Sequence, residues 1–377
     1  MIRGVLALAA GLLGGAACSA PSSAPAPAHA IAAAPAWQVR GAGGREPIEL
    51  GTSDPALVDA TRCAGCHQAI TAEWQTSRHA LAWTNDLFQR EYQTQEKPWC
   101  VNCHAPTAPQ QAELAAGGHV LADQGVSCAT CHVRAGRLVA ARRSAGSPHD
   151  TVVDPSFGSP AFCADCHEFT FPVLSPEGKA VAMTPHPMQS TVSSFTRGPH
   201  GRAPRGCLTC HDSDHGHGFP GGHDPGMVDT ALDVGWCRRG ASLEVAVTNV
   251  GAGHAVPTGD IHRHFLLKVW RSSAPAGLWE GFFGRRFDDA GDGGKRTIWD
   301  SSLAPGQTRR FAIEVAALAG EGGEADPAEP INLELVYVFI ERELPRADRA
   351  PREPGTATVV RWRSPLPEVP ACDRDPA

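Results

Sequence analysis

The chain has 377 residues, of which 42% are hydrophobic and only 6% aromatic, and its formal net charge is -7 at pH 7. A net negative charge argues against nucleic acid as a partner, because nucleic-acid binding relies on basic surface. The charge is compatible with docking to the basic faces of other proteins. Beyond the N-terminal segment, no stretch is long and apolar enough to span a membrane, so any membrane contact is expected through an anchor.

The N-terminus has the pattern of an export signal. Arg3 supplies a positive charge, and the apolar stretch from Val5 to Leu13 is too short for a membrane-spanning helix. Cys18 follows a run of small residues and resembles the lipidation site of a bacterial lipoprotein. Ordinary cleavage nearby, after residues 28–30, is the alternative. The chain is therefore expected to be exported, and to be either periplasmic or anchored to the outer membrane by a lipid at Cys18.

Five copies of the sequence Cys-x-x-Cys-His follow. In this motif two thiols add to the vinyl groups of a haem, and the histidine becomes a ligand of the iron. Zinc ribbons also use Cys-x-x-Cys pairs, but they need no histidine directly after each pair. The motifs predict five covalently bound haem c groups, attached to Cys63, Cys66, Cys100, Cys103, Cys128, Cys131, Cys163, Cys166, Cys207 and Cys210. The predicted proximal iron ligands are His67, His104, His132, His167 and His211.

The chemistry depends on the opposite face of each iron. An iron with two protein ligands carries electrons, whereas an iron with an open face can bind a substrate. Twelve histidines lie outside the motifs, enough to close all five irons, and Met188 is the most credible rival ligand. The sequence from Gln68 to Tyr92 predicts a helix, on which His79 lies about 18 Å from His67. His79 is therefore expected to serve a neighbouring haem.

Other histidines lie in segments whose backbone can approach a porphyrin closely. His149 belongs to the turn sequence Ser-Pro-His-Asp. His215, His217 and His223 lie in a glycine-rich segment, and glycine lets the backbone come close to a cofactor. His254 lies in a second glycine-rich segment, at the start of the C-terminal region. If His254 binds iron, the C-terminal region completes the haem array.

The C-terminal part changes character, because alternating Val-rich runs separated by Gly, Pro and Asp predict the strands of an antiparallel sandwich. Cys237 and Cys372 bracket this part, and a disulfide between them would stabilise it by about 2–5 kcal/mol. Two separate buried thiols are the alternative. The predicted strands are Leu243 to Val250, Phe265 to Trp270, Phe311 to Val315, Leu333 to Ile340 and Thr356 to Trp362.

The predicted fold is mainly short α-helices and loops around stacked haems, followed by an antiparallel β-sandwich. The haem region has roughly 37 residues per haem, too few for a conventional core around each one. The predicted boundaries are a signal peptide over 1–18, an Ala/Pro/Ser-rich linker over 19–50, a pentahaem cytochrome c domain over 51–233 and the sandwich over 234–377.

With these motifs the chain resembles bacterial multihaem c-type cytochromes related to the tetrahaem electron carriers of ammonia oxidation, those with a cytochrome c-554-like haem domain. The resemblance covers about residues 60 to 270. It rests on the five motifs and on EWQTSRHALA (73–82), GVSCATCH (125–132), PMQST (187–191), HGFPGGHD (217–224) and GHAVPTG (253–259). Similar proteins carry distal histidines in such phrases, which implies that role for His79, His217, His223 and His254. His149 is the fifth choice, ahead of His119, His186 and His200.

The leading functional prediction is a pentahaem electron carrier of the cell envelope with bis-histidine haems, acting with other redox proteins there. The alternative is an oxidoreductase that acts on a small nitrogen or sulfur compound at one open haem. Multihaem nitrite reductases typically carry a Lys-ligated haem, and related hydroxylamine oxidases use a cross-linked tyrosine. All five motifs here end in histidine, and the only tyrosines are Tyr92 and Tyr337. A third hypothesis is that the sandwich docks the chain into a larger assembly.

Overall fold

The structure is a computed structural model that describes residues 46–95, 97–202, 206–211, 215–291, 294–319, 326, 328–339 and 356–372. The predicted signal peptide, the lipidation site Cys18 and most of the predicted linker lie outside the described residues. Within the described ranges, no helix has the length and apolarity needed to cross a bilayer. Ile48 and Leu50, at the end of the predicted linker, are buried, and Ile48 forms a β-bridge with Thr107. The packed structure therefore includes the last residues of that segment.

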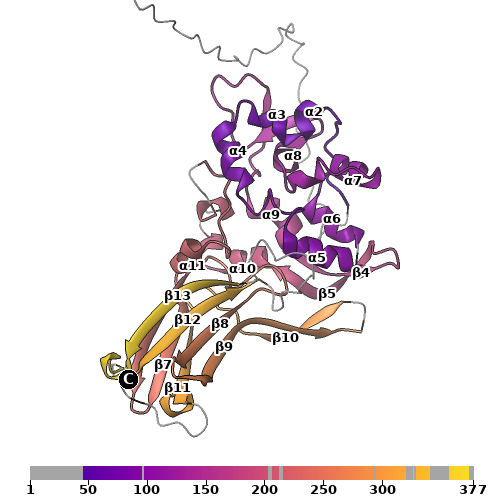
Figure 1. The fold of residues 1–377 in the computed structure, drawn as a ribbon. Coiled ribbons are helices and arrows are strands. Elements are labelled where there is room, and N and C mark those ends of the chain that lie inside the picture. The colour runs from indigo at the N-terminus through magenta and orange to yellow at the C-terminus, as the bar shows by residue number, and fades with distance from the viewer. Residues whose placement is uncertain are drawn as a thin grey trace, which may run out of the picture.

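Short helices make up the upper part of the molecule in Figure 1. The described residues contain ten α-helices. Their bounds are α2 Pro55–Val58, α3 Ala60–Ala64, α4 Gln68–Gln75, α5 Asp86–Gln95, α6 Pro98–His104, α7 Ala108–Ala115, α8 Cys128–His132, α9 Pro160–His167, α10 Thr191–Arg197 and α11 Pro225–Ala231. Two small sheets accompany them, made of β1 Val133–Arg134, β2 Arg137–Ala140 and β3 Thr151–Val153, and of β4 Glu168–Leu174 and β5 Ala180–Ser190.

Two sheets packed face to face form the lower part of the molecule (Figure 1). One sheet has the strand order β10-β9-β8-β12-β13, and the other has the order β11-β7-β6. All neighbouring strands in both sheets are antiparallel. The bounds are β6 Leu232–Arg239, β7 Ser242–Asn249, β8 His264–Arg271, β9 Ala274–Asp289, β10 Lys295–Asp300, β11 Thr308–Glu314, β12 Pro330–Val338 and β13 Thr356–Pro365.

The five predicted strands correspond to β7, β8, β11, β12 and β13, whereas β6, β9 and β10 were not predicted from the sequence. β10 is exposed along its whole length, so it lacks the alternation of apolar and polar residues that marks a half-buried strand. β9 contains three glycines, which weaken a strand pattern. The predicted disulfide between Cys237 and Cys372 is present and joins β6 to the C-terminal segment.

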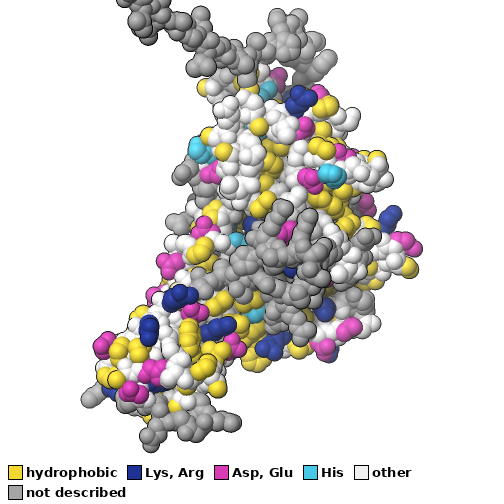
Figure 2. All heavy atoms as spheres, viewed as in Figure 1, with side chains coloured by type: hydrophobic (Ala, Val, Ile, Leu, Met, Phe, Trp, Pro, Cys, Tyr) yellow, Lys and Arg dark blue, Asp and Glu magenta, His cyan; other side chains and the backbone are white. Residues whose placement is uncertain are grey.

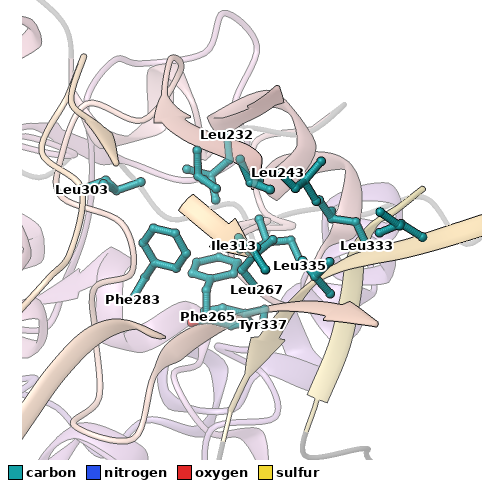
Figure 3. Packing of buried hydrophobic residues seen from close by; sticks show 14 of the residues in the cluster. Leu232, Leu243, Phe265, Leu267, Phe283, Leu303, Ile313, Leu333, Leu335 and Tyr337 are labelled. Carbon is teal, nitrogen blue, oxygen red and sulfur yellow. The ribbon is translucent and has the colours of Figure 1, made fainter. Parts of the chain in front are cut away.

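The main hydrophobic core lies between the two sheets (Figure 3). Along β7, the buried residues Leu243, Val245 and Val247 alternate with more exposed ones, because successive side chains of a strand point to opposite faces. They pack in one cluster with residues of β8, β9, β11 and β12, including Leu267 and Leu335. Burying side chains of this size contributes about 1.5–3 kcal/mol each. The sandwich therefore has the core of an ordinary domain.

The helical part has no comparable core among its described residues. Its buried apolar side chains form only small clusters, one around Leu50 and Val133, one around Trp83 and Val101, and one around Trp74. Hydrophobic side chains are visible over this part of the surface in Figure 2. A packed interior of native density is therefore not built from side chains alone.

The helix predicted from Gln68 to Tyr92 is interrupted. α4 ends at Gln75, turns follow, and α5 begins at Asp86. In the interruption, the carbonyl of His79 accepts a hydrogen bond from the backbone N–H of Val126 at 2.8 Å. A tertiary contact thus replaces helical hydrogen bonds at His79, and periodicity alone does not reveal such a contact.

Candidate haem-binding site

Local sequence signals place most of the five Cys-x-x-Cys-His motifs on short helices. The second, third and fourth motifs end α6, α8 and α9. Pro98 and Pro160 occupy the first turns of α6 and α9, where a missing N–H costs nothing. Ser159 caps α9, and Ser127 and Thr130 form a capping box on α8. Because residues three apart lie on one helix face, both thiols of a motif point to the same side.

All five motifs line one connected cavity of about 2060 Å³. Typical pockets for a single small ligand are about 300–1,000 Å³, so this space is too large for one such ligand. Every motif cysteine and every motif histidine belongs to the lining. Nine of the ten motif cysteines are free thiols, whereas Cys66 is disulfide-bonded. This donor set and the size of the cavity fit several covalently attached haems, which would supply the interior that the helical part lacks.

Four motif histidines each lie opposite a second histidine at a nearly constant separation. An imidazole nitrogen lies about 2 Å from a bound metal ion, so two imidazoles on opposite sides of one ion have ring centres about 6 Å apart. The pairs and their ring-centre distances are His67 with His149 (6.1 Å), His167 with His79 (6.3 Å), His132 with His217 (6.2 Å) and His211 with His254 (6.1 Å). The structure therefore brings together four of the five predicted distal histidines with four proximal ones.

Hydrogen bonds fix the tautomer of several of these rings. A carbonyl oxygen only accepts, so a ring nitrogen bonded to it carries the proton and leaves the other nitrogen free for a metal. Such bonds also orient the ring. Nδ1 is the donor in His104 to Ala82 (2.6 Å), His132 to Val139 (2.9 Å), His211 to Pro220 (2.6 Å), His217 to His215 (2.7 Å) and His254 to Ala255 (2.9 Å).

Burial keeps these imidazoles neutral, which is the form that binds metal ions. It lowers the pKa of His79 to about 3, with neighbouring His167 and His211 adding to the effect. Burial also lowers the pKa of His104, His132, His167 and His254. All five side chains are therefore available as neutral nitrogen ligands near pH 7.

Cysteines of different motifs lie side by side. The thiols of Cys63 and Cys128, in the first and third motifs, are hydrogen-bonded. The same holds for Cys163 and Cys207, in the fourth and fifth motifs. The attachment points within each of these two pairs of motifs are therefore direct neighbours.

His104, in the second motif, has a different environment. Its ring stacks on Phe88 with ring centres 3.6 Å apart and an interplanar angle of 6°. Within the described part of the chain, no histidine lies opposite it at the separation seen for the other four.

His223, the remaining predicted distal ligand, is placed against a different partner. Its Nδ1 lies 2.6 Å from Nη2 of Arg78, and its ring packs on Phe339 with ring centres 4.2 Å apart. The less favoured candidate His119 lies at the surface, 2.8 Å from Asp123.

Glu73 is a functional candidate that the sequence reasoning missed. Its carboxylate accepts hydrogen bonds from the backbone N–H groups of His215 (3.1 Å) and His217 (2.8 Å). These bonds hold the segment that presents His217 to His132. Glu73 belongs to the phrase that carries His79, but nothing in the sequence indicates a contact with a segment so distant along the chain.

Residues 62–133 match the family described as cytochrome c554 and c-prime. The fold is similar to that of a penta-haem cytochrome c552 from Thermochromatium tepidum, with a TM-score of 0.58 and 19% identity over 82% of this chain and 99% of that one. No curated protein matches the chain. Residues 62–133 therefore match a c-type cytochrome family, and the chain has the fold of a multihaem cytochrome.

Proposed function

We propose that the protein binds five haem c groups and transfers electrons among redox partners of the cell envelope. The observation that carries the proposal is the set of four histidine pairs with ring centres 6.1–6.3 Å apart. A pair at this separation can hold one iron from both sides, and an iron closed in this way carries electrons and does not bind a substrate. The bound haems supply the redox chemistry, and the chain fixes their ligands and surroundings.

The contacts between motifs support an order for the relay. The hydrogen-bonded thiols join the first motif to the third and the fourth to the fifth. Cys131 of the third motif lies within electrostatic reach of Cys166 of the fourth. The attachment points therefore follow the order first, third, fourth, fifth, which would keep neighbouring haems close enough for electron exchange. His254 brings the sandwich into this series as the partner of His211.

A second candidate function concerns the second motif. His104 is buried and has its Nδ1 bonded to Ala82, which leaves Nε2 for an iron. The described residues place no histidine ring about 6 Å from it, so this iron would have an open face as long as His262 and Met188, which line the same cavity, do not bind it. That observation favours binding or conversion of a small nitrogen or sulfur compound at this one position, alongside electron transfer through the other four.

The number of haems per chain and the spin state of each haem iron distinguish the two functions. We expect the mass of the purified protein to correspond to five haems per chain. Its ferric EPR spectrum is expected to contain four low-spin signals and one high-spin signal that changes with nitrite or hydroxylamine. Five low-spin signals would eliminate the second function and leave the relay. Fewer than five haems, or several high-spin signals, would contradict the proposed relay itself.

A further inference from the structure

The contact between Arg78 and His223 fixes which nitrogen of His223 carries the proton. A guanidinium group has only donors, so Nη2 of Arg78 donates and Nδ1 of His223 accepts, at 2.6 Å. Burial, together with the charges of Arg78 and Arg263, lowers the pKa of His223 to about 3, so the ring is neutral. Its proton therefore sits on Nε2. This is the reverse of His104, His132 and the other rings that donate through Nδ1, and it makes Nε2 of His223 a hydrogen-bond donor and not a metal ligand.

Other donors gather around the same ring. The ring of Tyr337 lies 6.4 Å from that of His223 at an interplanar angle of 89°. Arg263 lies over the Phe339 ring, 5.7 Å from its centre, and donates to the Phe339 carbonyl. Arg78, His223, Arg263 and Tyr337 all line the haem cavity. Two of these four donors are cationic, and the carboxylate of Asp260, which lies within electrostatic reach of Tyr337 and His104, lines the same cavity.

Two contacts place this group beside the second motif. Leu87 of α5 packs against the sandwich core that contains Tyr337 and Phe339, and the next residue, Phe88, stacks on His104. Arg263 lies within electrostatic reach of both His104 and His223. The donors therefore lie near His104, for which the described residues show no histidine partner, at the junction with the sandwich.

We propose that Arg78, His223, Arg263 and Tyr337 form an oxyanion-binding site beside the second Cys-x-x-Cys-His motif. The site rests on the proposed function, because it assumes a haem at that motif. Guanidinium groups bind planar oxyanions through paired N–H donors, and the neutral imidazole and the phenol add directional bonds. The ligand chemistry is an oxygen anion of carboxylate size. Such an anion can be either a free oxyanion that enters the cavity or a propionate group of the haem itself.

The test uses the purified holoprotein with Arg78→Met and His223→Phe. Arg137→Met and His119→Phe serve as matched controls, since both side chains are exposed and lie outside the cavity lining. Sodium nitrite and sodium sulfite are titrated into the ferric protein and followed by absorption and EPR. If the ligand is a free oxyanion, we expect saturable binding that perturbs the spectrum of one haem. Either variant should weaken the binding affinity about tenfold or more, and the controls should leave it unchanged.

If the ligand is the haem propionate, we expect neither nitrite nor sulfite to bind. The two variants then lower the midpoint potential of one haem, because loss of donors and of cationic charge leaves the propionate charge uncompensated, while the controls change nothing. The site is refuted if the variants leave both anion binding and every potential unchanged. It is also refuted if His223→Phe converts a low-spin haem into a high-spin one, since His223 would then be an iron ligand. The number of haems and the low-spin signals of the other motifs, measured in the same samples, report separately on the proposed relay.

Discussion

His79 and His167 lie with their ring centres 6.3 Å apart, although the second and third haem motifs separate them in the chain. The other three pairs have the same character, since each joins a motif histidine to a residue of a different segment. Each iron bound by such a pair would hold two distant parts of the chain together. The haems would then stabilise the helical part in the way that a hydrophobic core stabilises an ordinary domain.

Replacing Gly125 by alanine should disturb the haem held by His79 and His167. Gly125 has a φ of 57°, and an added Cβ would lie 2.5 Å from the carbonyl oxygen of His79. Gly117 has a φ of 81° and nothing within 4 Å of an added Cβ, so Gly117→Ala is a control with a positive φ and without the contact. We expect Gly125→Ala to shift the EPR signal of one haem. Equal spectra for the two variants would contradict the expectation.

Glu73→Gln should loosen the segment that carries His217. The carboxylate of Glu73 accepts two backbone hydrogen bonds there, and an amide has a single acceptor oxygen. Loss of such supporting bonds typically weakens a metal site about 10–100-fold. We expect a partial high-spin signal from the haem of the third motif, measured by ferric EPR. Glu177→Gln, at an exposed turn, is the control and should leave the spectrum unchanged.

His254→Met should raise the midpoint potential of one haem, because His/Met ligation gives higher potentials than bis-histidine ligation. The ring centres of His254 and His211 lie 6.1 Å apart. The control is His119→Met, because the native side chain is exposed and lies outside the cavity lining. A spectroelectrochemical titration measures the potentials of all haems together. An unchanged set of potentials in His254→Met would mean that His254 binds no iron.

Removing the disulfide should destabilise the sandwich and leave the haem spectra unchanged. Cys237 and Cys372 close a segment with a sequence separation of 135, and loss of such a bond typically costs about 2–5 kcal/mol. The expected result for Cys237→Ser/Cys372→Ser is a lower unfolding midpoint by differential scanning calorimetry. Val250→Ala, at an exposed site, should change stability by no more than about 0.5 kcal/mol. A midpoint equal to that of the wild type would show that the bond adds no stability.

Much of this architecture could be predicted because its signals are local. Each Cys-x-x-Cys-His motif contains its own predicted attachment cysteines and its predicted proximal iron ligand. The alternation of buried and exposed residues in β7 and β8 identifies two core strands. β10 escaped prediction because a fully exposed strand shows no alternation. The break around His79 escaped it because its cause, the contact with Val126, is distant in sequence.

The candidate site was predictable to a lesser extent, since the choice of distal partner depends on tertiary structure. His149 and His254 were singled out from turn and glycine patterns, but nothing local assigns them to His67 and His211. His223 looks equivalent to His217 in sequence. Their difference comes from Arg78, which lies next to His79 in the chain and reaches Nδ1 of His223 across the fold.

His254 comes from the segment that follows β7, so half of the pair around His211 belongs to the last third of the chain. During synthesis from the N-terminus, the partners of His67, His132 and His167 all emerge before it does. An iron held between His211 and His254 would therefore need β7 and the segment after it in place beside the fifth motif. The ligation state of that one haem would thus report whether the C-terminal sheets have folded.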